Sequence, residues 1–475
     1  MKTTRHQITF VIALLFNTFG LIVFSSMLRA EEVTHAVRLA KQYIQSGNAN
    51  ERIALSQKLA PFDGKWESVQ NALQSSTPRK KAKPGYYGKE HFSTTKLRKK
   101  HPDDLLYFIV PKNYQPKHAT GLIIFMHGGG KGSPRISPAR YMRRDKPTEA
   151  YIGDIFEKTG MIGVAPSAPW NPNDHSRWTL SETDDYLADV IAECKSRFHI
   201  DSSRVFLWGH SMGGFGAFHQ VQRQPDRFAA VISGAGSWTL GQWSVTRGTM
   251  FCIVHGVKDA ERGVRDRHTD IQYARLADKL LTEQKIPHVF KEHAGGHPIA
   301  DSKKSVLDFF KKYSRLKRNP FPRHVAVASQ VGFRVSKCFP KKESYWLTLN
   351  TPTKKGLLEY DALTISTHGN KKESSLEEWK KWGLTHKKVK RPGALIDVIN
   401  LGNNQFQITA VNTSKLTIWL HPKMVDFNKP IKMTINGKIK IEKRVTPSLI
   451  TLLDSFKRRH DWDITYPAKI TLQIP

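Results

Sequence analysis

The chain has 475 residues, 39% of them hydrophobic, and its formal net charge at pH 7 is +34. This length allows two or three domains with a sizeable core. The three cysteines, Cys194, Cys252 and Cys338, allow at most one disulfide and exclude a disulfide-rich scaffold. None has CxxC spacing, so we expect no metal site and no cofactor. Cys252 lies in the apolar run "TMFCIVHG" and is predicted to be a buried thiol.

The large excess of Lys and Arg favours anionic partners such as acidic polysaccharide, anionic lipid surfaces or nucleic acid. A solvated basic surface is the simpler alternative. The basic clusters at 79–83, 96–100 and 386–391 contain few aromatic residues, and no nucleic-acid-binding motif accompanies them. We therefore expect no nucleic-acid partner, while contact between the basic surface and an anionic polymer stays open.

The first thirty residues have the pattern of a secretory signal peptide. Lys2 and Arg5 precede the apolar run 8–24, which is followed by "SSMLRA" and then by two glutamates. We predict a signal peptide over 1–30, cleavage after Ala30 and a secreted or periplasmic protein. The apolar run is long for a signal peptide, so an uncleaved N-terminal anchor is the alternative. No other stretch is long and apolar enough to span a membrane.

Residues 31–83 are predicted to be helical, and residues 84–316 alternate between strands and helices. Helices are expected at 272–284 and 302–315, among others. Short apolar runs closed by Gly or Pro are predicted strands: "DLLYFIVP", "TGLIIFMHGGG", "MIGVAPSAP", "VFLWG", "AAVISGAG", "MFCIVHG" and "PHVFKEHAG". This alternation predicts an α/β fold, with a mostly parallel sheet covered by helices on both faces. Ligands of such sheets bind at the carboxyl ends of the strands.

After the predicted linker "RNPFPRH", residues 317–475 are predicted to form a C-terminal antiparallel β domain resembling a sandwich. Alternating apolar and polar residues and Asn-Gly turns indicate the strands. A charged insertion near 368–393 interrupts it. Four tryptophans of this region were considered as carbohydrate-stacking residues. Trp346 and Trp419 are expected in the core, and Trp379 and Trp382 on the surface.

Ser211 stands in "GHSMG", which fits the G-x-S-x-G pattern of a nucleophile on a strained strand-to-helix turn. The turn requires small neighbours, here Gly209 and Gly213, because the serine backbone adopts an unfavourable conformation. The strand-like "VFLWG" before it and the helix-like run after it supply the expected context. A chance serine in a Gly-rich turn is the alternative.

A serine hydroxyl needs a base, and the base needs an orienting carboxylate. In this fold the chain order is Ser, then Asp or Glu, then His. Asp259 follows the strand "MFCIVHG", and His297 follows the last strand on a Gly-Gly turn, so both are predicted catalytic residues. The rival residues lie further from a strand end or have less freedom to reach the serine: Glu261, Asp266, Asp270 and His293.

Two backbone N–H groups are needed to stabilise the oxyanion. Met212, directly after the nucleophile, is predicted to supply one. The loop "HGGG" after an earlier strand is predicted to supply the other, from Gly128, Gly129 or Gly130. The residues do not indicate which of the three it is.

The chain resembles the α/β-hydrolase superfamily, and more closely the secreted dienelactone-hydrolase-like, prolyl-oligopeptidase-like and feruloyl-esterase-like bacterial hydrolases. The resemblance covers 86–316 and rests on the following segments: "MHGGG", "IDSSRVFLWGHSMGGFGAF", "PDRFAAVISGAG", "VHGVKD" and "GGH". It implies esterase or peptidase chemistry on Ser211, Asp259 and His297. The β-propeller of true prolyl oligopeptidases is not expected, because 31–83 is too short and looks helical.

The leading hypothesis is a secreted carboxylesterase that acts on an ester through an acyl-enzyme. A polysaccharide-linked ester is one candidate substrate. A serine peptidase that cleaves short peptides is the second hypothesis, and a catalytically idle polymer-binding protein is the third. A segment after a strand, "APSAPWNPNDHSRWTL", is predicted to overhang the site. Its candidate pocket residues, for which a packed aromatic loop is the alternative, are Trp170, His175, Arg177 and Trp178.

Overall fold

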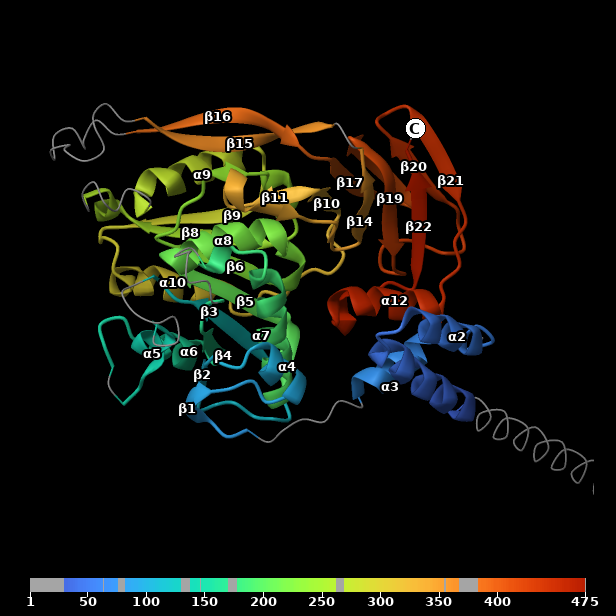
Figure 1. The fold of residues 1–475 in the computed structure, drawn as a ribbon, viewed down its shortest axis with the longest axis horizontal. Coiled ribbons are helices and arrows are strands. Elements are labelled where there is room, and N and C mark those ends of the chain that lie inside the picture. Colours follow the sequence, from blue (N-terminus) through green and yellow to red (C-terminus); the bar gives the residue numbers. More distant parts are fainter. Residues whose placement is uncertain are drawn as a thin grey trace, which may run out of the picture. The chain divides into compact units, whose positions relative to one another are not determined.

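The structure of the chain is a computed structural model (Figure 1). It describes residues 30–62, 64–75, 82–129, 137–145, 147–169, 177–261, 269–353, 356–366 and 383–474. The chain divides into two compact units. The smaller one comprises 1–78, 419–422 and 445–469, and the larger one comprises 79–418, 423–444 and 470–475. The predicted signal peptide lies almost entirely outside the described residues.

The larger unit is built on a sheet with the strand order β1-β2-β4-β3-β5-β6-β8-β9. Its strands are β1 Gly85–Glu90, β2 Leu106–Val110, β3 Thr120–Met126, β4 Ile162–Pro166, β5 Ile200–His210, β6 Ala230–Gly234, β8 Met250–Gly256 and β9 His288–His293. Only β2 runs antiparallel to its neighbours β1 and β4 in this described sheet. The carboxyl ends of the central strands therefore meet at one edge.

Helices cover both faces of this sheet, as the alternation of strands and helices predicted. One core contains residues of α7 Thr183–Arg197, α8 Met212–Arg223 and α9 Ile271–Glu283. The opposite core contains residues of α5 Ser137–Met142, α6 Gly153–Thr159 and α10 Ile299–Tyr313. Burial on both faces explains why the inner strands read as continuous apolar runs.

The C-terminal region adds two further sheets. One has the order β10-β17-β18-β20-β21, and the other has the order β13-β14-β19-β22. Their strands are β10 His324–Ala328, β13 Glu343–Ser344, β14 Leu347–Pro352, β17 Leu395–Gly402, β18 Gln405–Val411, β19 Thr413–Leu420, β20 Ile431–Ile435, β21 Ile439–Lys443 and β22 Ala468–Gln473. Neighbouring strands are antiparallel in the following pairs: β10 with β17, β17 with β18, β20 with β21, and β14 with β19. Strands β18 and β20 are parallel, because β19, which lies between them in the sequence, belongs to the other sheet.

Both expected core tryptophans are buried, with exposed fractions of 0% for Trp346 and 8% for Trp419. Trp379 and Trp382 lie outside the described residues. The second half of the predicted charged insertion forms a strand, β16 Gly383–Pro392, which pairs along its length with β15 Leu357–Ser366. Its Lys and Arg side chains are exposed at the open edge of this pair, a common means of blocking edge-to-edge association.

The C-terminal region is joined to the parallel sheet within the same compact unit. The short strand β7 Leu240–Gly241, which follows β6, pairs with β15. The predicted linker also packs against the catalytic region, because Arg318 is 4% exposed and donates a hydrogen bond to the Asp226 carbonyl. The backbone N–H of Arg318 donates to the carbonyl of Ser203.

The smaller unit is helical and has its own core. Its helices are 30–45, α2 Ala49–Leu59, α3 Trp66–Ser75 and, from the far end of the sequence, α12 Leu449–Arg459. Leucines of all four helices meet in one apolar cluster. Asn48 and Ser448 cap α2 and α12 by accepting hydrogen bonds from backbone N–H groups of their first turns.

The remaining elements are short. They are α4 Thr95–Lys100, the strands β11 Gln330–Gly332 and β12 Cys338–Pro340, and the 3₁₀ turns η1 Arg177–Thr179, η2 Pro225–Arg227, η3 Trp243–Thr246, η4 Val257–Glu261, η6 Val335–Lys337 and η7 Trp462–Ile464. No helix in the described part of the chain is long and apolar enough to cross a bilayer. All three cysteines are free, and Cys252 is buried as predicted.

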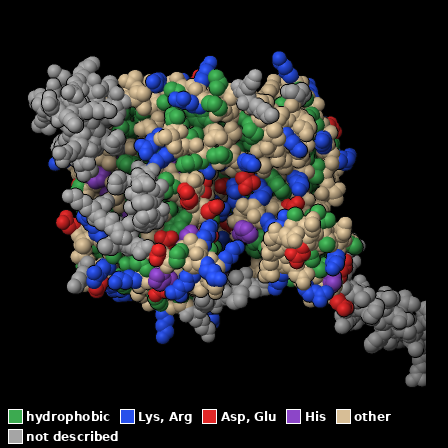
Figure 2. Space-filling view, viewed as in Figure 1, with side chains coloured by type: hydrophobic (Ala, Val, Ile, Leu, Met, Phe, Trp, Pro, Cys, Tyr) green, Lys and Arg blue, Asp and Glu red, His purple; other side chains and the backbone are tan. Residues whose placement is uncertain are grey.

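Lys and Arg side chains are scattered over the face drawn in Figure 2, with Asp and Glu side chains among them. One basic cluster, 96–100, lies on α4, where Arg98 and Lys99 are exposed and Lys100 contacts Asp189 at 2.7 Å. These side chains are solvated or paired with carboxylates. The described clusters therefore fit a solvated basic surface.

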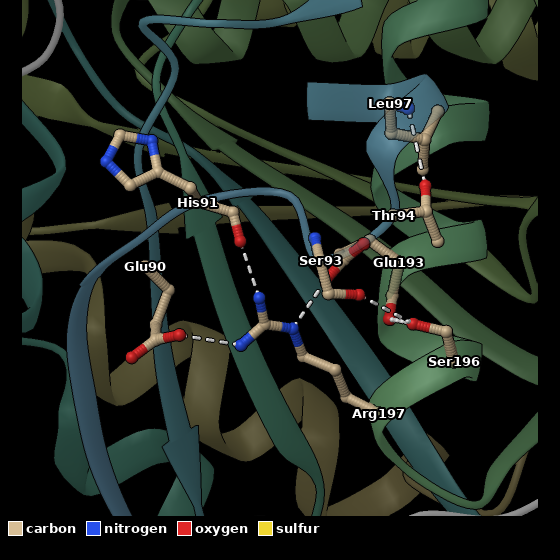
Figure 3. Close-up of polar contacts among 8 residues, drawn as sticks. All are labelled: Glu90, His91, Ser93, Thr94, Leu97, Glu193, Ser196 and Arg197. Atoms are coloured by element: carbon tan, nitrogen blue, oxygen red, sulfur yellow. Dashed lines mark hydrogen bonds and ion pairs between the residues drawn. The ribbon is translucent and has the colours of Figure 1, made fainter. Parts of the chain in front are cut away.

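Arg197 joins the end of β1 to α7 through a buried ion pair (Figure 3). Its guanidinium donates to Glu90 Oε2 at 2.8 Å, to the His91 carbonyl and to Glu193 Oε1. Glu193 is fully buried and also accepts the backbone N–H of Ser93. Burial disfavours the charged guanidinium, but the two carboxylates outweigh it and raise the pKa of Arg197.

We expect Arg197→Ala to lower the free energy of unfolding by about 3 kcal/mol, because it leaves the buried Glu193 carboxylate without its cation. Urea denaturation measures this. Arg275→Ala is the matched control, because Arg275 pairs with the partly exposed Glu292 and its loss should cost about 1 kcal/mol or less. Equal losses in the two variants would contradict the role of burial.

Candidate active site

Ser211 lies on a sharp turn between β5 and α8, at the edge where the carboxyl ends of the strands meet. Its backbone has φ 56° and ψ −117°, a conformation that L-residues rarely adopt. Its N–H donates to the carbonyl of Gly234 at 2.9 Å. A Cβ on Gly209 would lie 1.9 Å from the Gly213 carbonyl oxygen, and one on Gly213 would lie 1.9 Å from the Met126 carbonyl oxygen. Glycine is therefore required on both sides of the serine.

Ser211, His297 and Asp259 form a continuous chain of hydrogen bonds. The Ser211 Oγ lies 2.9 Å from His297 Nε2, and His297 Nδ1 lies 2.9 Å from Asp259 Oδ2. An ionised carboxylate can only accept, so Nδ1 carries the proton and Nε2 is free to accept the hydroxyl hydrogen. This arrangement allows the imidazole to take the proton as the serine oxygen attacks.

Asp259 is 1% exposed and is held by two further groups. His255, at the end of β8, places Nε2 3.2 Å from Asp259 Oδ2 and 2.7 Å from the Thr269 carbonyl. The Thr269 hydroxyl donates to Asp259 Oδ1 at 3.2 Å. Burial would raise the pKa of this carboxyl, but hydrogen bonds from His255 and His297 outweigh it and lower the pKa to about 2.

The rival residues lie in other positions. Asp270 caps α9 by accepting the Gln272 N–H, and burial raises its pKa. His293 is the last residue of β9 and shares no hydrogen bond with Ser211 or Asp259 in the described part of the chain. Asp266 lies outside the described residues, as does the side chain of Glu261.

The loop after β3 runs beside Ser211. A Cβ on Gly128 would lie 3.3 Å from Ser211 Cβ and 2.9 Å from the Tyr141 hydroxyl, and one on Gly129 would lie 3.7 Å from Met212 Cβ. Residues 128 and 129 therefore lie at the N-terminus of α8. Gly130 is outside the described residues.

Side chains below the loop determine how its peptide groups point. The Trp178 indole N–H donates to the His127 carbonyl at 3.0 Å, and the Gly128 carbonyl bonds with His127 Nδ1 at 2.8 Å. Burial raises the pKa of Tyr141, whose hydroxyl lies close to Gly128. In a trans peptide the N–H points opposite to the C=O, so the Gly129 N–H points away from the His127 ring.

The structure describes the side chain of only one of the four candidate pocket residues, Trp178. Trp170 and His175 lie outside the described residues, and of Arg177 only the backbone is described. Trp178 is fully buried and supports the loop from below, so its side chain offers no surface to a substrate in this structure. The sequence analysis assigned no role to His255, Thr269 or Tyr141. The spacing "HGVKD", with a histidine four residues before the acid, was an available signal for His255.

Residues 167–275 match the model of the prolyl oligopeptidase family, a span that contains Ser211 and Asp259. Over 86 residues the chain is 30% identical to the bifunctional acetylxylan esterase/xylanase XynS20E of Neocallimastix patriciarum. That match covers 18% of this chain and 13% of the relative, so it spans about an eighth of the relative's length. One of these matches is thus to a family of peptidases, and the other is to a relative whose name includes an esterase.

Similar solved structures include both kinds of enzyme. A ferulic acid esterase is 14% identical to this chain, with a TM-score of 0.38. The match covers 49% of this chain and 98% of the esterase. The acylaminoacyl peptidase of Pyrococcus horikoshii is also 14% identical, with a TM-score of 0.36 and coverage of 50% and 42%. The parallel sheet with helices on both faces is the α/β-hydrolase fold that the sequence resemblance implied.

We expect Trp178→Phe to lower kcat about tenfold with little change in KM, because it removes the N–H that holds the His127 carbonyl. Direct loss of an oxyanion donor costs more, about 10²–10³-fold. Trp208→Phe is the matched control, because Trp208 is equally buried but its indole N–H has no hydrogen-bond partner in the described part of the chain. Steady-state kinetics on an ester measures both variants. An equal loss of activity in the two would contradict the role of the Trp178 N–H in holding the loop.

We expect Asp259→Asn to lower kcat by about 10³–10⁴-fold at pH 7, because an amide cannot hold His297 in the reactive tautomer.

The lowered pKa of Asp259 also predicts that the stability of the fold depends on pH. The ionised carboxylate stabilises the fold at pH values above the ordinary aspartate pKa of 3.8. This contribution is lost as the pH falls towards the lowered pKa of about 2.

Urea unfolding of wild type and Asp259→Asn at pH 7, 5 and 3 measures that contribution. The stability difference should be equal at pH 7 and 5 and smaller at pH 3. A difference that already shrinks between pH 7 and 5 would show that the pKa of Asp259 is not lowered.

Proposed function

We propose that the hydrolase is a carboxylesterase that forms an acyl-enzyme on Ser211. The observation that carries this proposal is the hydrogen-bonded chain from Asp259 through His297 to Ser211, at the N-terminus of α8. His297 takes the hydroxyl proton as Ser211 attacks the ester carbonyl, and it then protonates the leaving alcohol. Water, activated by the same imidazole, hydrolyses the acyl-enzyme and restores the serine.

Asp259 keeps the imidazole oriented and stabilises its charged form. His255 and Thr269 support Asp259, since His255 Nε2 lies beside the same Oδ2 that bonds with His297 and the Thr269 hydroxyl donates to Oδ1. The fixed negative charge is therefore present before the proton moves, so no reorganisation is needed when the imidazolium forms.

The Met212 N–H and the Gly129 N–H are the proposed oxyanion donors. The Gly128 carbonyl bonds with His127, so the Gly129 N–H of the same peptide group is directed away from that supporting ring. Met212 is the first residue of α8, whose N-terminal partial positive charge adds to the stabilisation of the oxyanion.

Esters are the preferred substrates, and short peptides are the second candidate. The relative from Neocallimastix patriciarum carries an acetylxylan esterase in its name, which supports a polysaccharide-linked ester. The match to the prolyl oligopeptidase family supports the peptidase alternative. The described residues before the catalytic sheet form helices rather than the propeller strands of such peptidases. Export with cleavage after Ala30 remains part of the proposal and rests on the sequence pattern.

The test compares p-nitrophenyl acetate, p-nitrophenyl butyrate and a methyl hydroxycinnamate with chromogenic dipeptides. Wild type should hydrolyse esters, and Ser211→Ala should retain no more than the background rate. A fluorophosphonate probe should label wild type and not the variant. Cleavage of peptides alone would replace the esterase proposal with the peptidase one, and failure of the probe to label Ser211 would contradict both.

A further inference from the structure

A hairpin from the C-terminal region lies along the helix that carries the nucleophile. Strands β11 and β12 pair with each other, and the turn η6 joins them. The Arg223 guanidinium at the end of α8 donates to the carbonyls of Val331 and Phe339, one on each strand, at 3.1 and 3.0 Å. The base of the hairpin is thus held at the C-terminal end of α8.

The hairpin points from there towards the catalytic serine. The Phe333 ring, directly after β11, stacks on the Phe215 ring with 5.5 Å between centroids and 24° between planes. Phe215 lies in the first turn of α8, where its N–H donates to the Ser211 carbonyl at 3.0 Å. The hairpin therefore extends along α8 from Arg223 to the turn that holds the nucleophile.

Three exposed residues, Arg334, Val335 and Ser336, form the end of this hairpin and are called the 334–336 tip. The residues on either side, Phe333 and Lys337, are each only 6% exposed. The Phe333 N–H donates to the Lys337 carbonyl at 3.2 Å, which closes the turn. The tip is therefore a fixed surface and not a loose loop.

Lys337 joins the tip to a second element, the turn η1. Its Nζ donates to the Thr179 hydroxyl at 3.3 Å, and Thr179 belongs to η1, which follows the segment after β4. The carboxyl ends of strands carry the substrate site in sheets of this kind. The tip thus lies between the nucleophile helix and a segment that leaves the same edge of the sheet.

The chemistry of the tip indicates what it binds. Arg334 is exposed and forms no ion pair with any described residue, whereas Arg223 of the same region is paired with Asp184. Val335 beside it is 50% exposed, among the few large apolar side chains exposed to this extent in the described residues. A planar guanidinium beside an apolar side chain is suited to a carboxylate on a partly apolar ligand.

We propose that the 334–336 tip is part of the substrate-binding surface and that Arg334 binds a carboxylate of the ester substrate. This inference rests on the proposed esterase activity and specifies the substrate class as acidic esters. The C-terminal region then supplies substrate selection to a site whose reacting groups all lie in the parallel-sheet region. The basic surface of the chain would favour the approach of such substrates.

The experiment measures kcat and KM for one neutral and two anionic esters. p-Nitrophenyl acetate is the neutral reference, p-nitrophenyl hemisuccinate carries a carboxylate on the acyl side, and 4-acetoxybenzoate carries one on the alcohol side. Arg334→Glu should raise KM for at least one anionic ester about tenfold, since it replaces an attractive charge by a repulsive one. The readout is the ratio of the KM for that anionic ester to the KM for p-nitrophenyl acetate, and it should rise about tenfold relative to wild type. Added salt should reduce the difference.

Lys117→Glu is the matched control, because Lys117 is also exposed and has no ion pair among the described residues, but it precedes β3 at the opposite edge of the sheet. It makes the same change in net charge and should leave the ratio of anionic to neutral KM unchanged. If Arg334→Glu changes that ratio no more than Lys117→Glu does, Arg334 does not recognise the carboxylate. If the fluorophosphonate probe fails to label Ser211 in the wild type, the esterase proposal fails, and this inference fails with it.

Discussion

The backbone of Ser211 is the constraint on which the site depends. A non-glycine residue in such a conformation costs of order 1–3 kcal/mol, so the surrounding structure must hold it there. The Ser211 N–H bonded to Gly234 and the close approach of Gly213 to Met126 do so. Both partners lie on strands that flank β5, so the parallel sheet itself holds the nucleophile above its edge. An antiparallel arrangement of the same strands would not bring these three strand ends together.

The sequence predicted those parts of the site that depend on chain order. Ser211, Asp259 and His297 follow strand ends, and the parallel sheet brings strand ends to one edge whatever the intervening loops do. The supporting residues could not be predicted in this way. The contacts of Trp178, Tyr141 and Thr269 depend on how particular loops fold back beneath the site. No spacing rule encodes such contacts, and Trp178 was accordingly expected in the pocket rather than below the loop.

In the C-terminal region, too, the sequence predicted the strands but not the long-range contacts between them. Its strands were evident from alternation and Asn-Gly turns, but the parallel pair of β18 and β20 and the addition of β15 to β7 depend on long-range packing. The segment "RNPFPRH" reads as a linker because Pro and Asn disfavour helices and strands. Arg318 nevertheless fills a buried position beside the parallel sheet, where its guanidinium donates to the Asp226 carbonyl. A sequence that looks flexible can be held firmly by one long side chain.

The smaller unit has a consequence for how the protein is made. Its first helices bury Leu39, Leu55 and Leu73 against Leu452 and Leu453 of α12, which leave the ribosome last of these. From Leu73 to Leu449 there are 449 − 73 = 376 residues of synthesis. At about 5–20 residues per second this takes on the order of 20–75 s. Throughout that time the apolar faces of the first helices lack their final partner, so they are a natural place for a chaperone to bind the growing chain.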